Sequence, residues 1–309
     1  MPEDMTSVIH GTPISPGLAE GPIHLHRDLL GPIDAPDCIE QGGVEAEFSR
    51  LDLATTRISD DLLALATRVE EEIDSELAGI FGAHRLMATD ASLKDELRRE
   101  IADNLVNASS AVKTVLLRWE KRFLSMESQI SQDKGEDIRD VAIRLRNALA
   151  GITVHPLEQM PHGSVLVASR LLPSDTVFLG PRSASAVLLE YGSISSHAAL
   201  FAREMGLPCI SGLPGLLSRA PHGAPALVDA CAGTVTIHPD EKQRVEFRTK
   251  VDRRRIAHRS AREHAQRPAV TEDGVSISVL ANVGCREDTK NAMLNGAEGV
   301  GLYRMEQAY

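Results

Sequence analysis

The feature that most constrains the fold is a long helical segment that interrupts a chain otherwise patterned for strands. From about Val44 to Ala150, proline and glycine are scarce and apolar residues recur at helical spacing. One such series is Leu62, Leu65, Ala66, Val69, Ile73 and Leu77. Residues 7–30 instead alternate around Gly and Pro turns, and short aliphatic runs return after Gly151. The sequence therefore predicts an α/β fold with an all-α helical bundle inserted between its two parts.

Within the helical segment, we expect helices over residues 80–89, 92–104, 108–129 and 136–149. Ser92 is the predicted N-cap of one of them, and Gly135 a predicted break.

Beyond the bundle, short aliphatic runs predict strands over residues 164–168, 186–189, 225–229 and 234–238. A helix is expected from His197 to Met205, ended by Gly206.

The last part of the chain has a different character. Residues 240–266 are strongly charged and predict an exposed connecting helix, followed by a strand at 275–281, a helix at 287–294 and a strand at 299–303. A single β-α-β unit cannot bury both faces of its sheet, so we expect the start of a further domain. The predicted divisions are 1–43 and 151–239 for the α/β domain, 44–150 for the bundle, 240–270 for the linker helix and 271–309 for the further domain.

Charge and composition exclude several classes of partner. The net charge of −11 argues against nucleic acid or an anionic membrane and suits a basic protein partner. The four cysteines are scattered, which is typical of reduced thiols in a cytosolic protein. No apolar run approaches the length of a membrane span, and the acidic N-terminus lacks a signal-peptide pattern. The cytoplasm is therefore the expected location.

The most informative segment is residues 190–212, EYGSISSHAALFAREMGLPCISG. It predicts a strand, a Gly/Ser loop and then His197 in the first turn of a helix. Free N–H groups and the positive end of the helix dipole favour an anion there, and they favour the neutral imidazole that a nucleophile needs. Hydroxyls of Ser193, Ser195 and Ser196 would lie near a phosphoryl group on the ring.

By residue type alone His197 is only a candidate, because a histidine near a helix start is more often a surface or capping residue. The other histidines show no metal-binding spacing, so no metal ligand is predicted.

Residues 195–212 resemble the phosphohistidine motif of the phosphoenolpyruvate (PEP)-utilising enzymes. That group includes Enzyme I of the phosphotransferase system, pyruvate phosphate dikinase and PEP synthase. Other segments favour Enzyme I, the PEP-protein phosphotransferase: residues 11–21 resemble its opening strand and turn, and the helices between 80 and 145 resemble its inserted bundle. Residues 173–176, Pro-Ser-Asp-Thr, resemble its Pro-Ser-Glu-Thr motif, and residues 281–284 and 295–304 resemble the start of its PEP-binding barrel.

This resemblance implies specific roles. His197 would be phosphorylated transiently, through Nε2, on an α/β domain that swivels between two partners. Thr176 would hydrogen-bond the active histidine, Ser196 would help to orient the ring or the phosphoryl group, and Arg304 would bind the phosphate of PEP in an intact barrel. The bundle would dock HPr, a phosphocarrier protein.

The resemblance also assigns residues 271–309 to the first β-α-β unit of a TIM-type barrel that binds PEP and Mg²⁺, with no Mg²⁺ ligand in this chain. The implied activity is phosphoryl transfer from PEP to HPr through the phosphohistidine. By itself, this chain is expected to exchange a phosphoryl group with phosphorylated HPr but not to take one from PEP.

Departures from the family motif leave two other functions open. The loop before the histidine usually reads Gly-Gly-Arg-Thr-Ser-His, whereas here Ser193 replaces a glycine and Ile194 replaces a basic residue. One alternative is therefore a non-catalytic regulator that binds an HPr-like protein. Another is the swivelling domain of a dikinase-type or synthase-type enzyme, against which the helical insertion argues.

Overall fold

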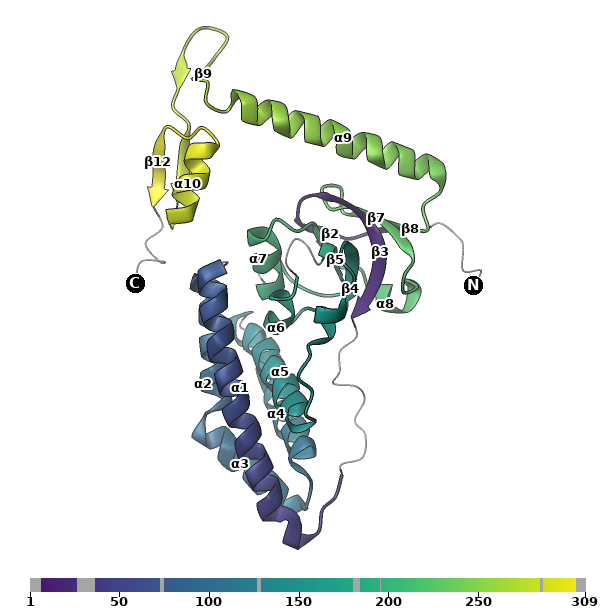
Figure 1. Cartoon of the computed structure of the whole chain (residues 1–309), viewed down its shortest axis with the longest axis vertical. Coiled ribbons are helices and arrows are strands. Elements are labelled where there is room, and N and C mark those ends of the chain that lie inside the picture. Colours follow the sequence, from purple (N-terminus) through teal and green to yellow (C-terminus); the bar gives the residue numbers. More distant parts are fainter. Residues whose placement is uncertain are drawn as a thin grey trace. The chain divides into compact units, whose positions relative to one another are not determined.

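A computed structural model describes residues 7–26, 37–72, 75–126, 129–179, 184–194, 196–283 and 286–303 (Figure 1). The chain divides into two compact units, Met1–Pro239 and Asp240–Tyr309. Each unit is described by itself.

The α/β part of the first unit is built on an eight-stranded sheet with the order β1-β8-β7-β3-β4-β5-β6-β2. The strands are β1 (Ser7–His10), β2 (Thr12–Ser15), β3 (Leu18–His26), β4 (Ser164–Ala168), β5 (Ala184–Leu189), β6 (Cys209–Ser211), β7 (Pro225–Asp229) and β8 (Thr234–Ile237). Neighbours from β3 to β6 run parallel, and the remaining pairs are antiparallel. Strands β1, β3 and β2 from before the bundle lie at both edges and in the middle of this sheet, among the strands from after the bundle, so both flanking segments build one layer.

Both faces of the sheet are covered, as the short aliphatic runs predict. In β4, Val165 and Val167 belong to one apolar cluster, whereas Leu166 and Ala168 belong to another. Successive strand residues point to opposite faces, so the two clusters lie on opposite sides of the sheet. Helix α7 (His197–Glu204) contributes to the second cluster, and α8 (Leu216–Arg219) contributes to the first.

Five helices form the bundle: α1 (Val44–Glu72), α2 (Ser75–Ala88), α3 (Ala91–Asn104), α4 (Ala108–Leu124) and α5 (Gln129–Leu149) (Figure 1). Their shared core is aliphatic and includes Leu51, Ile101, Val112 and Leu145, which are almost fully buried. Burial of such amphipathic faces, rather than helix propensity, supplies most of the stability of helices in proteins.

The helix boundaries correct three predictions. The N-cap of α3 is Asp90 rather than Ser92, because the Asp90 carboxylate accepts from the Leu93 amide at 3.0 Å. Helix α4 ends at Leu124, five residues before the predicted end. Helix α5 begins at Gln129 and continues through Gly135, the predicted break. Gly135 is buried, and the helix continues through it despite the intrinsic cost of about 1 kcal/mol for a mid-helix glycine.

An apolar cluster joins the bundle to the α/β layer. It combines Leu62 and Val69 of α1, Phe81 of α2, and Val177 and Phe201 from the α/β part. The Phe81 and Phe201 rings are fully buried and meet edge to face, with centroids 6.4 Å apart. This contact fixes α7, and therefore His197 at its start, against the bundle.

The second unit consists of α9 (Glu241–His264), β9 (Ala269–Val270), β10 (Ser276–Ile277), β11 (Leu280–Val283), α10 (Arg286–Leu294) and β12 (Gly299–Tyr303). Strands β11 and β12 pair in parallel and α10 connects them, so the predicted β-α-β unit is present. The predicted strand at 275–281 is wrong in detail, because β10 pairs with β9 while Leu280 and Ala281 pair with β12. Helix α9 has a capping box at Asp240 and Gln243, and none of its described side chains is buried. Within the described residues, no helix is both long and apolar enough to cross a membrane.

Candidate active site

The segment before His197 is held in place by two serine hydroxyl groups, one from the segment itself and one from β6. Ser196 is the N-cap of α7, where its Oγ accepts from the Ala199 amide at 3.3 Å and donates to the Ser193 carbonyl at 3.0 Å. Ser211 of β6 donates to the Gly192 carbonyl at 2.8 Å, and Gly192 has a φ of +147° that favours glycine. These bonds place His197 at the first helical position, as the sequence predicts.

Arg203, in the last turn of α7, reaches back to the same loop. Its Nη2 donates to the Ile194 carbonyl at 2.8 Å, and its Nε donates to the Ile14 carbonyl of β2 at 3.2 Å. The guanidinium therefore joins the loop, the helix and an edge strand. The Ile194 side chain itself is exposed.

The His197 ring faces the bundle rather than the α/β layer alone. Its Nδ1 lies 3.4 Å from Oδ1 of Asp137 on α5, and 22% of the side chain is exposed. The same Asp137 oxygen lies 3.0 Å from Nε2 of His84 on α2, whose side chain is completely buried. Asp137 therefore connects two histidines from separate elements, and Nε2 of His197 is the ring nitrogen that this carboxylate does not engage.

A second buried carboxylate, Asp140, continues this network. Its Oδ2 lies 3.7 Å from Nδ1 of His84 and accepts from the Ser174 amide at 2.8 Å. Arg144, one turn further along α5, places its Nε 3.4 Å from Asp140 Oδ1. The network thus extends from His197 through α5 to the short helix α6 (Pro173–Thr176).

Thr176 is completely buried on α6, and its hydroxyl donates to the Pro173 carbonyl at 2.6 Å. A hydroxyl has one proton to donate, so this proton is already used within α6. The hydrogen bond to the active histidine that the resemblance implies stays a prediction, and it would require the Thr176 oxygen to act as the acceptor.

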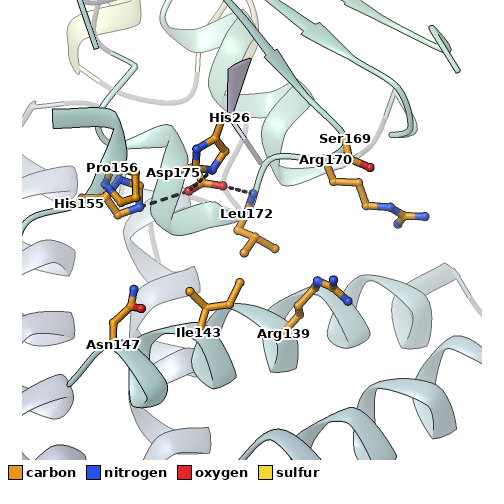
Figure 2. A pocket seen from close by; sticks show the side chains of 10 residues that line it. All are labelled: His26, Arg139, Ile143, Asn147, His155, Pro156, Ser169, Arg170, Leu172 and Asp175. Atoms are coloured by element: carbon orange, nitrogen blue, oxygen red, sulfur yellow. Dashed lines mark hydrogen bonds and ion pairs between the residues drawn. The ribbon is translucent and has the colours of Figure 1, made fainter. Parts of the chain in front are cut away.

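Helix α6 carries another charged cluster on Asp175 (Figure 2). Its Oδ1 lies 3.3 Å from Nε2 of His26 and 3.2 Å from Nε2 of His155, while Oδ2 accepts from the Leu172 amide at 2.9 Å. Burial opposes ionisation of this carboxyl, but the hydrogen bonds from the two histidines outweigh it and hold the Asp175 pKa far below its ordinary value. The His155 ring stacks on Phe178 at 4.2 Å.

The Asp175 cluster borders a pocket at the edge of the bundle. Figure 2 shows Arg139, Ile143 and Asn147 pointing toward it from α5. Helix α5 therefore approaches the α/β layer along several turns, from Asp137 near His197 to Asn147 at this pocket.

Among the described residues, no group of three or more His, Cys, Asp or Glu side chains could hold a metal ion. Arg304 and Ser195 lie outside the described residues. Asp137, His84 and Arg203 were not among the predicted site residues. For Asp137 there is one faint local signal: like Asp140, it is an acidic residue that flanks the apolar face of an amphipathic helix.

Comparisons with known proteins agree with this architecture. Three family models match the chain in order: "PEP-utilising enzyme, N-terminal" over residues 10–134, "PEP-utilising enzyme, mobile domain" over 160–233 and "PEP-utilising enzyme, PEP-binding domain" over 258–309. Together they match well over half of the chain.

Curated relatives point the same way. The chain is 29% identical over 305 residues to a phosphoenolpyruvate-protein phosphotransferase of Geobacillus stearothermophilus, covering 97% of this chain and 52% of that protein. It is 30% identical over 265 residues to the phosphoenolpyruvate-protein phosphotransferase of Bacillus subtilis, covering 86% and 46% respectively. The chain thus spans about half the length of the curated relatives that it matches.

A solved structure described as Enzyme I (nEIt) matches with a TM-score of 0.65 and 27% identity, covering 80% of this chain and 99% of that one. A second, described as the N-terminal domain of Enzyme 1 - Nitrogen, matches with a TM-score of 0.52 and 23% identity over 79% of this chain and 99% of that one. The second likeness supports the fold alone.

Proposed function

Since the chain belongs to the family of PEP-utilising enzymes, we propose that it carries a phosphoryl group on His197 and exchanges it with an HPr-like phosphocarrier protein. The observation that supports this most directly is the position of His197. It stands at the first turn of α7, behind a loop fixed by Ser196, Ser211 and Arg203, with Nδ1 directed at a buried carboxylate. Such preorganised groups are the main contribution that a protein makes to phosphoryl transfer.

In this proposal the start of α7 receives the phosphoryl oxygens. The first N–H groups of a helix lack intrahelical acceptors, and the helix dipole adds to their attraction for an anion. Ser196 holds this helix start in place through its capping bond. Arg203 keeps the preceding loop against β2, so the loop does not have to be ordered when the phosphoryl group arrives.

The proposed partner would dock on the bundle. Helix α2 exposes Leu86, an apolar residue that is 74% accessible; Asp90, the N-cap of α3, follows four residues later, and the whole chain has a net charge of −11. An exposed apolar residue on an acidic protein suits a basic carrier protein, since complementary charge speeds the encounter.

The step with PEP and Mg²⁺ is proposed for the barrel of the whole enzyme, together with phosphate binding by Arg304. The PEP-binding family model matches residues 258–309 of this chain, and the chain spans about half the length of its curated relatives. For the 309-residue chain tested by itself, we therefore expect exchange with phosphorylated HPr and no phosphorylation by PEP.

The test incubates the chain with ³²P-labelled phospho-HPr and locates the label by peptide mapping. We expect acid-labile label on His197, none on His197→Ala, and full labelling of His162→Ala, a change at an exposed histidine elsewhere in the layer. Absence of label on the wild-type chain, or equal label on His197→Ala, would contradict the proposal. Binding of HPr without transfer would support the regulator instead.

A further inference from the structure

We infer that Asp137 is a positioning residue for the phosphohistidine: its carboxylate accepts the Nδ1–H of His197 and so presents the Nε2 lone pair to the phosphoryl donor. This inference rests on the proposed function and deepens it. It assigns to the helical bundle a part in the chemistry, in addition to partner docking.

The geometry that carries the inference is the shared position of one carboxylate oxygen. Asp137 Oδ1 lies 3.4 Å from His197 Nδ1 and 3.0 Å from His84 Nε2. An ionised carboxylate can only accept hydrogen bonds, whereas a neutral imidazole donates from one nitrogen and accepts at the other. The contact therefore selects the tautomer of His197 that carries its proton on Nδ1.

That tautomer is the one the proposed reaction needs. The Nε2 lone pair attacks phosphorus, the P–N bond to the carrier histidine breaks, and its electron pair returns to that ring. If the other nitrogen of the carrier ring is protonated, the ring leaves as neutral imidazole and no proton has to move. His197 becomes a positively charged phosphoimidazole ring whose Nδ1–H still points at Asp137. The carboxylate therefore stabilises charge that develops as the new bond forms, as the carboxylate of a Ser-His-Asp triad does for its imidazolium.

The surroundings keep Asp137 in place without the need for His197. His84 is completely buried, and its ring meets Phe81 edge to face with centroids 6.0 Å apart. Its other nitrogen faces Asp140, which is itself held by the Ser174 amide. A carboxylate fixed in this way keeps its orientation between turnovers, and such preorganisation is what a positioning group contributes.

The test compares wild type, Asp137→Asn and Asp137→Glu in the full 309-residue chain. Nitrogen-15 NMR of the His197 ring at neutral pH reports the tautomer directly. We expect the Nδ1–H form in wild type, a shift toward Nε2–H in Asp137→Asn, and partial recovery in Asp137→Glu. The rate of phosphoryl uptake from phospho-HPr should fall about 10- to 100-fold in Asp137→Asn. That is less than the roughly 10⁴-fold loss for a triad carboxylate, because the His197 ring is partly exposed.

Glu136→Gln is the matched control. Glu136 precedes Asp137 on α5 but pairs with Arg170 at 2.8 Å, so its loss should leave the tautomer of His197 and the rate unchanged. Thermal unfolding of each variant identifies any loss of rate that comes from misfolding, and the tautomer is then read on the folded fraction.

Either of two results would overturn the inference. One is a wild-type His197 that carries its proton on Nε2. The other is a folded Asp137→Asn variant whose ratio of the two tautomers, or whose rate of phosphoryl uptake, stays within twofold of wild type. If the wild-type chain takes no label from phospho-HPr, the proposed function fails, but the NMR measurement still decides the role of Asp137.

Discussion

The rings of Phe81 and Phe201 meet edge to face across the boundary between the bundle and the α/β layer, with centroids 6.4 Å apart and an angle of 65° between their planes. Phe81 comes from α2 and Phe201 from the middle of α7, so the helix that begins with His197 is anchored directly to the bundle. Edge-to-face pairs contribute about 0.5–1.5 kcal/mol beyond the burial of their area.

Removal of this anchor should destabilise the first unit. We expect Phe201→Ala to lower the free energy of unfolding by about 3–5 kcal/mol, because it leaves a cavity among fully buried side chains. Urea unfolding followed by circular dichroism measures the change. Leu200→Ala, at a neighbouring position that is 38% exposed, should cost no more than about 1 kcal/mol. Equal losses for the two variants would contradict this role of the cluster.

The Asp175 cluster gives a prediction about pH. Hydrogen bonds from His155 and His26 lower the Asp175 pKa despite burial, so the ionised carboxylate stabilises the fold above the unfolded pKa near 3.9 and this contribution is lost as the pH falls. We expect Asp175→Asn to cost about 2–4 kcal/mol at pH 7 and at pH 5. The difference in the free energy of unfolding between wild type and Asp175→Asn should become smaller only below about pH 4.

Urea unfolding at several pH values measures this difference. Asp60→Asn, at an exposed position on α1, is the control and should stay close to wild type at every pH. A difference for Asp175→Asn that grows as the solution becomes more acidic would show that the sign is wrong.

The described cysteine thiols should differ in their reactivity toward alkylating reagents. Burial raises the pKa of Cys209 to about 12, with a smaller opposing effect of Arg203, whereas Cys38 and Cys231 are exposed. Because the thiolate is the nucleophile, iodoacetamide at pH 8 should alkylate Cys38 and Cys231 in the native protein and leave Cys209 unmodified until the chain is unfolded. Peptide mass mapping before and after addition of denaturant checks this, and rapid native labelling of Cys209 would contradict the buried position of β6.

Loss of the cap at Ser196 should affect both stability and chemistry. Ser196→Ala removes the acceptor for the Ala199 amide, which costs about 0.5–2 kcal/mol. Because the helix start would then fray around His197, phosphoryl uptake should slow as well. Ser196→Thr keeps a capping oxygen and should restore most of both properties. The two measurements are chemical unfolding and label transfer from phospho-HPr. An unchanged rate of phosphoryl uptake in Ser196→Ala would contradict the expected effect of the cap on the reaction.

Local signals made much of the fold predictable. The strand at 164–168, the helix beginning at His197 and the bundle between strand-rich segments all follow from period, capping residues and turn residues. Errors arose where two local choices compete. Asp90 and Ser92 are both acceptable N-caps, and only the approach of Leu93 N to Asp90 decides between them. Gly135 looks like a helix break until tertiary packing buries it.

The candidate site was predicted only in its local part. His197 and Ser196 are adjacent, so the preference for serine at a helix N-cap and the family motif together predict both residues. Asp137 lies 60 positions earlier in the chain and His84 more than 100, and no periodicity links either of them to a loop in another domain. Their convergence depends on how the bundle packs against the layer. The same limit applies to Asp175, whose histidine partners come from β3 and from the segment just after α5.

The Ser174 amide has a further consequence. It is buried, and it donates to Asp140, a carboxylate on the other side of the boundary between α6 and α5. Solvent deuterium can replace its hydrogen only when this hydrogen bond opens. Hydrogen exchange at this single amide therefore reports on separation of α6 from α5. Its exchange rate, compared with the rates of amides inside β4, would show how often the layer that carries His197 detaches from the bundle while each part stays folded.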